Sequence, residues 1–411
     1  MRALRVFILL GALLSSAWLT PDAAQARGEA LHWIGTWGAA PASTQPMAGA
    51  NGGLASPSFD NQTIVQVLRL SAGGRRMRIR FTNEYGGSPL LIGGARVAIL
   101  SPEGQIVPGS DRTVTFGGAT SAVAPAGAPM LSDPIPLATK NFERLRVSLY
   151  LPGRTGPCTC HMRGGELVQV SPPGDWTRRP LPPASGVEAY RAFISRVDVE
   201  TGLGSSVIVA LGDSITDGVS STIGANRRWP DLLAERLAAR FPQQAFGVVN
   251  AGIGGNRLLG DGRFSYQGQS ALSRLDRDAL SVAGASHLLV LEGINDLGRS
   301  EGRPTPSELI LGYRQLIARA RAAGLEVIGA TILPFEGAAY FTEQGEASRQ
   351  AVNAWIRRSG EFDAVVDLDM ALRDPDRPAR LRADLQSGDW LHPNDAGYRA
   401  ISDAIDILML R

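Results

Sequence analysis

The stretch VIVALGDSITDG, residues 207–218, decides the fold of the second half of this chain and locates its candidate chemistry. Its first five residues are all apolar, which is typical of a parallel strand buried on both faces. Ser214 follows directly, at the carboxyl end of that strand, where open α/β sheets bind their ligands. A serine hydroxyl becomes a useful nucleophile only when a base takes its proton and donors stabilise the resulting oxyanion. The rest of the chain must therefore supply both.

The sequence around this stretch alternates buried strands with amphipathic helices. Short apolar runs recur at residues 247–250, 288–291, 327–331 and 364–366. Helical spacing of apolar residues occurs at 230–240 and at 306–323, and we expect a closing helix at 394–410. Gly324 directly follows the second of these and is typical of a helix C-terminus. The alternation predicts a doubly wound, mostly parallel α/β domain over residues 201–411.

The first half of the chain has a different pattern. Alternating or short apolar segments separated by Gly and Pro clusters predict strands at 64–70, 76–81, 95–100, 113–116, 145–151 and 192–199. Strands with one wet and one buried face are typical of antiparallel sheets. We therefore expect an all-β, sandwich-like domain over residues 27–200.

Residues 1–26 have the pattern of a signal peptide. Arg2 and Arg5 precede an apolar stretch at 6–19, and Ala24-Gln25-Ala26 is the small-x-small pattern of a cleavage site. The alternative, an N-terminal membrane anchor, needs a longer apolar run than this one. We expect export to the periplasm or the medium, with no stable membrane insertion after cleavage.

Composition excludes several classes of function. Lys and Arg total 41 and Asp and Glu total 39, with no dense basic run, so nucleic acid is not an expected partner. Lys140 is the sole lysine, which excludes a P-loop or a lysine Schiff base elsewhere. Cys158 and Cys160 are two apart, near or beyond the reach of an unstrained disulfide, and we expect two thiols or one bridge. With His161 they make an incomplete zinc site, so no metal is expected. No organic cofactor is expected either.

Four segments of the α/β half carry the polar residues that chemistry requires, and each lies after a predicted strand or before the closing helix. They are GDSITDG at 212–218, NAGIGGN at 250–256, EGIND at 292–296 and DWLHPN at 389–394. A carboxylate three residues before an imidazole can accept its Nδ1 hydrogen and leave Nε2 facing a serine. No Gly-x-Ser-x-Gly directly follows a predicted strand, as the elbow of an α/β-hydrolase requires, and this disfavours that fold.

These segments, in this order, resemble the blocks of the SGNH, or GDSL, hydrolase family, whose flavodoxin-like fold fits residues 201–411. The resemblance implies that Ser214 is the nucleophile, His392 the general base and Asp389 the acid that orients His392. It further implies an oxyanion hole of Ser214, Gly255 and Asn295, and it leaves open whether Gly254 or Gly255 supplies the amide. Segments 33–37, 82–86 and 197–199 are similar to the leading β-domain of secreted bacterial GDSL esterases.

Other polar residues near the four segments have simpler interpretations. We expect Asp213, Asp217 and Asp296 to be local hydrogen-bonding residues of turns. His287 begins an apolar strand and is expected to be a core-edge histidine. Trp33, Trp37 and Trp176 belong to the sandwich core or stack on sugar rings.

The sequence thus predicts a secreted serine esterase (EC 3.1.1.-) that acts through an acyl-enzyme. The expected substrate is a small molecule or a polysaccharide carrying short acyl groups such as acetyl. Three alternatives remain open: a lysophospholipase or lipase, an acyltransferase with the same triad, and a non-catalytic carbohydrate-binding protein.

Overall fold

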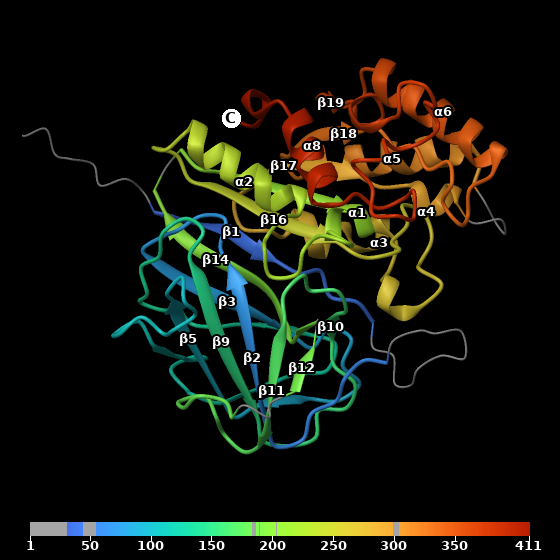
Figure 1. Ribbon diagram of the computed structural model, residues 1–411. Helices are drawn as coiled ribbons and strands as arrows, with labels where there is room; N and C mark the ends of the chain where they lie inside the picture. Colours follow the sequence, from blue (N-terminus) through green and yellow to red (C-terminus); the bar gives the residue numbers. More distant parts are fainter. Residues whose placement is uncertain (1–30, 44–54, 183–185, 189, 203, 299–303) are drawn as a thin grey trace, which may run out of the picture.

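The computed structural model describes residues 31–43, 55–182, 186–188, 190–202, 204–298 and 304–411. The predicted signal peptide, residues 1–26, lies outside these described residues. Figure 1 shows two lobes, an all-β lobe in blue to green and an α/β lobe in yellow-green to red. The last strand of the all-β lobe ends at Thr201, and the first strand of the α/β lobe begins at Ser206.

The α/β lobe is built on a five-stranded parallel sheet in the order β16-β15-β17-β18-β19. Its strands are β15 (Ser206–Gly212), β16 (Phe246–Gly252), β17 (Ala285–Leu291), β18 (Glu326–Ala330) and β19 (Ala364–Val366). This order reverses beside β15, at the switch point where such sheets bind ligands. The predicted parallel sheet and fold class are confirmed.

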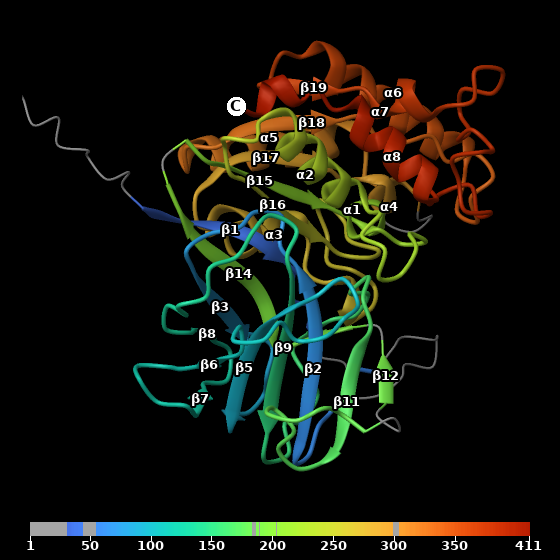
Figure 2. The same cartoon turned by 60° about the vertical axis from the view of Figure 1, so that its left-hand side comes forward.

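Helices cover both faces of this sheet (Figure 2). Alternate residues of β15 pack to opposite sides: Ile208 and Ala210 join one buried cluster, and Val207 and Val209 join the other. The longer helices are α2 (Trp229–Arg240), α5 (Pro306–Ala322), α6 (Glu343–Arg358) and α8 (Asp395–Ala404); the shorter ones are α1 (Ser214–Asp217), α3 (Ala271–Leu275), α4 (Ile294–Leu297) and α7 (Leu368–Leu372). The 3₁₀ turns η1 (Ser265–Gln267) and η3 (Ile407–Leu410) and the π-helical turn η2 (Asp276–Leu280) complete this lobe.

One helix prediction needs correction, and one helix was not predicted. The closing helix does not continue to residue 410, because Ile405 has extended backbone angles and Asp406 caps a separate turn. Helix α6 was not predicted at all. Its buried face carries Arg349 and Asn353 beside Val352 and Ile356, so the apolar period that identifies a helix is interrupted.

The all-β lobe is a sandwich of two antiparallel sheets, as predicted. One sheet has the order β1-β14-β3-β8, the other the order β12-β11-β2-β9-β5-β6, and the pairs β4-β7 and β10-β13 stand beside them. The strands are β1 (His32–Gly38), β2 (Gln62–Arg69), β3 (Arg76–Thr82), β4 (Leu90–Ile92), β5 (Gly94–Leu100), β6 (Arg112–Val114), β7 (Ala122–Ala124), β8 (Pro129–Leu131), β9 (Arg144–Leu151), β10 (Cys160–His161), β11 (Val168–Pro173), β12 (Gly186–Glu188), β13 (Arg191–Ala192) and β14 (Ile194–Thr201).

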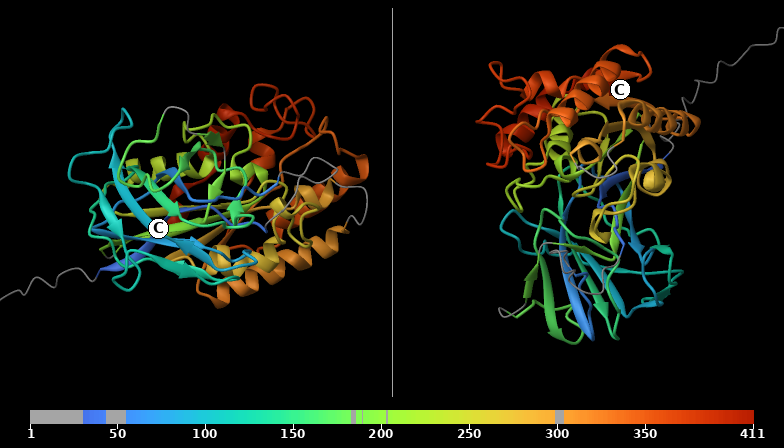
Figure 3. Two further views of the ribbon diagram at one scale, coloured as in Figure 1. Left: turned by 90° about the horizontal axis from the view of Figure 1, so that it is seen from below. Right: turned by 90° about the vertical axis from the view of Figure 1, so that its right-hand side faces the viewer.

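The sandwich packs on the β16 edge of the parallel sheet, and the two lobes share one buried apolar cluster. Strand β1 lies against β16 (Figures 1 and 2), and Figure 3 shows the two lobes from two further sides. The approach is so close that a Cβ on Gly247 would lie 2.1 Å from the Gly35 carbonyl oxygen. Ser71 adds a hydrogen bond by accepting the Val248 N–H at 2.8 Å. An edge strand covered in this way is protected from pairing with another chain.

Cys158 and Cys160 form a disulfide with their Cα atoms 5.3 Å apart. This separation lies within the range that disulfides span. Of the two outcomes expected from the sequence, the bridge is therefore the one present. Among the described residues, no helix is long and apolar enough to cross a membrane.

Candidate active site

Ser214 sits at the start of the short helix α1, directly beyond β15. The side chain of Asp213 caps this helix by accepting the Ile215 N–H at 2.8 Å. A helix start leaves its first N–H groups without intrahelical partners, so the Ser214 amide is available to a ligand. The strand end therefore presents both the Ser214 hydroxyl and its N–H at the edge of the sheet.

The imidazole of His392 lies between Ser214 and Asp389, although Ser214 and His392 are 178 residues apart in sequence. His392 Nε2 is 2.9 Å from Ser214 Oγ, and His392 Nδ1 is 2.5 Å from Asp389 Oδ2. The other Asp389 oxygen accepts the backbone N–H groups of Leu391 and His392 at 3.0 and 2.9 Å. The turn before α8 thus holds the carboxylate, and the carboxylate holds the ring.

Charge at Asp389 is favoured by these contacts. Partial burial raises the pKa of Asp389, but the hydrogen bonds from His392 and Leu391 outweigh burial and lower the pKa below its ordinary value. An ionised Asp389 accepts the Nδ1 hydrogen of His392 and leaves Nε2 as a proton acceptor toward Ser214. The arrangement can remove a proton from the serine hydroxyl.

The glycine turn after β16 lies beside Ser214. The Gly254 N–H donates to Asp217 Oδ2 at 3.1 Å, so this amide is already engaged. Gly255 has φ +78°, and a Cβ there would lie 2.5 Å from Gln267 Nε2, so only glycine fits. Gly255 lines the cavity next to Ser214. Of the two glycines, Gly255 is the one whose amide is free to face a ligand.

Asn295 reaches the same place from α4, which follows β17. Its side chain is buried, and Nδ2 donates one hydrogen to the Asn256 carbonyl at 2.9 Å. An amide nitrogen has a second hydrogen, and Asn295 lines the cavity with Ser214 and Gly255. Donors on three different segments therefore line one cavity.

Two polar residues behind this turn were not identified from the sequence. Asn256 is fully buried, and its side chain binds the carbonyls of Gln267 and Gln269 at 2.8 Å each. Arg274 donates to Asn256 Oδ1 at 2.9 Å and to the Gly212 carbonyl at 3.0 Å. Through these hydrogen bonds, Asn256 and Arg274 connect the glycine turn to the end of β15. Only the position of Asn256 within NAGIGGN signalled such a role.

The three acids that were predicted to form local hydrogen bonds in turns fall into two groups. Asp213 acts locally, as expected, and burial raises its pKa to about 7. Asp217 and Asp296 do not act locally: they bind backbone amides 37 and 38 residues away, at Gly254 and Leu258. Burial also raises the pKa of Asp296, to about 6. All three carboxyls are engaged by backbone amides, and none of the hydrogen bonds described joins one to Ser214 Oγ.

His287 is buried in β17, with Nδ1 2.8 Å from Ser286 Oγ, as befits a core-edge histidine. The sandwich tryptophans are each covered by an arginine. The pairs are Trp33 with Arg78, Trp37 with Arg191 and Trp176 with Arg179.

Ser214 and His392 open into a cavity of about 170 Å³. Its lining combines the donors with apolar and aromatic side chains: Val219, Tyr266, Tyr340 and Leu391. Arg163 enters the lining from the sandwich, and the other lining residues belong to the α/β lobe. No feature of the sequence around Arg163 indicated this placement.

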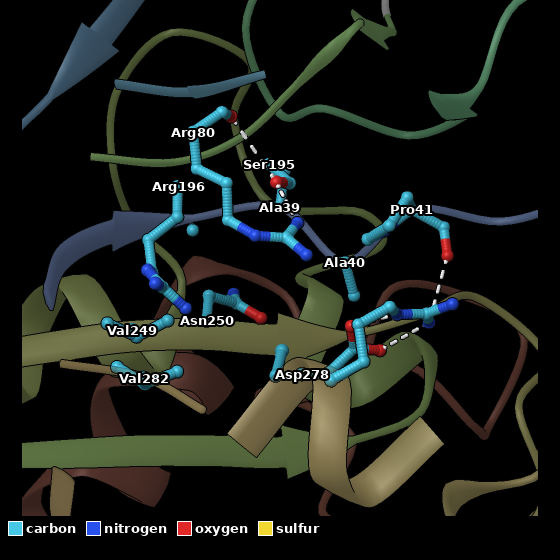
Figure 4. Close-up of a pocket in the computed structure, with 13 residues that line it drawn as sticks. Ala39, Ala40, Pro41, Arg80, Ser195, Arg196, Val249, Asn250, Asp278 and Val282 are labelled. Carbon is cyan, nitrogen blue, oxygen red and sulfur yellow. Dashed lines mark hydrogen bonds and ion pairs between the residues drawn. The ribbon is translucent and has the colours of Figure 1, made fainter. Parts of the chain in front are cut away.

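A second cavity lies at the seam between the lobes (Figure 4) and is about 20 Å³. Its arginines are already paired: Arg80 with Glu84, Arg196 with Asp198 and Arg277 with Asp278. A space of this size holds about one water molecule. Of these two cavities, the one at Ser214 is therefore the one with room for a small organic ligand.

Comparison with known proteins agrees with the resemblance seen in the sequence. Residues 210–400 match the model of the GDSL-like lipase/acylhydrolase family. Among curated protein sequences, none matches this chain.

Several solved structures are similar to about half of this chain. An acetyl xylan esterase from Geobacillus stearothermophilus is 21% identical, over 49% of this chain and 92% of that one, with a TM-score of 0.38. The esterase EstA from a Pseudoalteromonas species is 21% identical, over 48% and 93%, with a TM-score of 0.34. A GDSL-like lipase from Bacteroides thetaiotaomicron is 18% identical, over 48% and 84%, with a TM-score of 0.34.

Proposed function

Because residues 210–400 form a domain of the GDSL-like lipase/acylhydrolase family, we propose that this protein is a serine esterase that removes short acyl groups from carbohydrates or simple alcohols. One observation carries the proposal. The hydrogen-bonded chain from Asp389 through His392 to Ser214 ends at a cavity that oxyanion donors also line. A binding protein has no need of a base directed at a serine hydroxyl.

The reaction proceeds in two steps. Ser214 Oγ attacks the ester carbonyl carbon while its proton passes to His392 Nε2, and the carbonyl electron pair becomes the oxyanion. The N–H groups of Ser214 and Gly255 and the Asn295 amide stabilise that oxyanion. His392 then gives the proton to the leaving alcohol, and an acyl-enzyme remains. Water, activated by the same histidine, repeats the sequence and releases the acid.

The size of the cavity supports a short acyl group. At about 170 Å³ it is smaller than the range of about 300–1,000 Å³ typical of sites for drug-sized ligands. We expect kcat/KM for 4-nitrophenyl acetate to exceed that for 4-nitrophenyl decanoate by about 10-fold or more, because a long chain would leave apolar surface in water. Initial rates below the solubility limit of each ester measure this ratio. A preference for decanoate would favour the lipase alternative instead.

Export is part of the same proposal. The signal-peptide pattern of residues 1–26 supports it, and so does the disulfide between Cys158 and Cys160, since disulfides persist in oxidising compartments. We expect a bacterium expressing the full chain to place esterase activity in the periplasm or medium, with a mature N-terminus at Arg27. A variant lacking residues 1–26 is the control and should stay inside. Activity of the full chain confined to the cytoplasmic fraction would contradict export.

A further inference from the structure

His161, in β10 of the sandwich, lies at the seam between the lobes, and its side chain is 6% exposed. Its Nδ1 is 2.9 Å from the Ala40 carbonyl oxygen. Its Nε2 is 3.0 Å from Asp217 Oδ1 and 3.2 Å from the Arg163 carbonyl oxygen. Every partner is an acceptor, so both ring nitrogens donate hydrogens. The geometry therefore describes an imidazolium cation paired with Asp217.

Asp217 connects this cation to the active site. It belongs to α1, the helix that begins with Ser214, and its side chain is 3% exposed. While Oδ1 faces His161, Oδ2 accepts the Gly254 N–H at 3.1 Å. The next residue is Gly255, whose amide donates to the oxyanion in the proposed function. A continuous set of contacts thus runs from the sandwich to the oxyanion hole.

The positive charge on His161 matters because Asp217 is buried. A buried carboxylate without a cation is costly, and it avoids that cost by taking up a proton or by moving toward water. Burial lowers the pKa of His161, but the charge of Asp217 and the hydrogen bonds to Asp217, Ala40 and Arg163 raise it above its ordinary value. The direction of this shift agrees with the charged ring that the two donor contacts of His161 require.

We propose that His161 is a positioning residue for ester hydrolysis, which holds Asp217 and, through it, the Gly254–Gly255 turn in the orientation that stabilises the oxyanion. The inference rests on the proposed function. It makes the sandwich a part of the catalytic unit, in addition to a cover for the sheet edge.

The test replaces the charged ring by a neutral donor, in His161→Gln. We expect kcat for 4-nitrophenyl acetate to fall about 10-fold, since small displacements of a catalytic group are costly, while KM stays within about twofold. The affinity for a methyl trifluoromethyl ketone should fall by the same factor. Ser214 Oγ adds to its carbonyl carbon, His392 takes the proton and the former carbonyl oxygen becomes an oxyanion, so this affinity reports on the oxyanion hole.

Two further variants separate positioning from stability. His287→Gln removes a histidine that is also buried and is not among the residues that line the cavity, and it should keep the wild-type kcat. Asp217→Asn weakens the contact between His161 and Asp217 from the α/β lobe. It tests the same inference if His161→Gln fails to fold. It should reproduce the loss in kcat and in ketone affinity. The double variant should lose no more than Asp217→Asn alone, because the two residues act on one turn.

Wild-type kcat and ketone affinity in a folded His161→Gln, or losses that multiply in the double variant, would overturn the inference. These outcomes are distinct from failure of the proposed function. In that case the wild-type protein itself would show no ester hydrolysis that depends on Ser214.

Discussion

Ser214→Ala should lower kcat for 4-nitrophenyl acetate by about 10⁴- to 10⁶-fold, because it removes the atom that forms the acyl-enzyme. Binding and the oxyanion donors remain, so a small residual rate over water is expected. Stopped-flow measurement should also lose the burst of nitrophenol that marks acyl-enzyme formation. His392→Ala should give a loss of similar size, since serine and base act as one unit.

Covalent labelling tests whether the Ser214 hydroxyl is the nucleophile. A fluorophosphonate should modify wild-type protein at Ser214, found by mass spectrometry of the peptide, and should leave Ser214→Ala unmodified. Ser221→Ala is the matched control, because Ser221 lies seven residues away and its hydroxyl donates to the Gly218 carbonyl at 2.7 Å. It should keep both labelling and rate. Hydrolysis at the wild-type rate by folded Ser214→Ala would exclude the mechanism.

Asn295→Ala should lower kcat by about 10²- to 10³-fold with little change in KM, because it removes one oxyanion donor that acts mainly in the transition state. In free-energy terms the barrier rises by about 3–4 kcal/mol. Steady-state kinetics on the acetate ester measure the effect. The trifluoromethyl ketone should lose affinity in parallel.

A second buried asparagine controls for the loss of packing. Asn353 binds the backbone of Ile332 with both ends of its amide, away from the cavity. Asn353→Ala should lower the unfolding temperature yet keep kcat at a temperature where it is folded. If Asn295→Ala changed stability but not kcat, Asn295 would be a structural residue and the oxyanion hole would need another donor.

The parallel sheet could be predicted because its strands are buried on both faces and read as continuous apolar runs. The predicted run 207–211 lies inside β15 (Ser206–Gly212), and the other runs lie equally close to their strands. Helix α6 could not be predicted in this way. Arg349 on its buried face is paired with Asp369 at 2.8 Å, and such a pairing is invisible to a count of apolar residues.

The four polar segments could be recognised because each lies at a strand end or before the closing helix. Their resemblance to the GDSL family is confirmed over residues 210–400. The assignment of chemical roles to Ser214, Asp389 and His392 stays a prediction until the variants are measured. The cavity is also lined by Arg163, Tyr266 and Tyr340, which no sequence motif predicted.

The sequence by itself determined the two architectures and the kinds of side chain that follow each strand of the α/β lobe. These depend on spacings of two to four residues, which are local properties of the chain. Only the tertiary structure decided that Gly254 is engaged by Asp217, that Gly255 lines the cavity, and that His161 contacts Asp217 from the other lobe. His161 and Asp217 are 56 residues apart and lie in different lobes, so their contact depends on how the lobes pack together. Burial of both side chains at that seam turns an ordinary histidine and aspartate into an ion pair, and no local pattern encodes it.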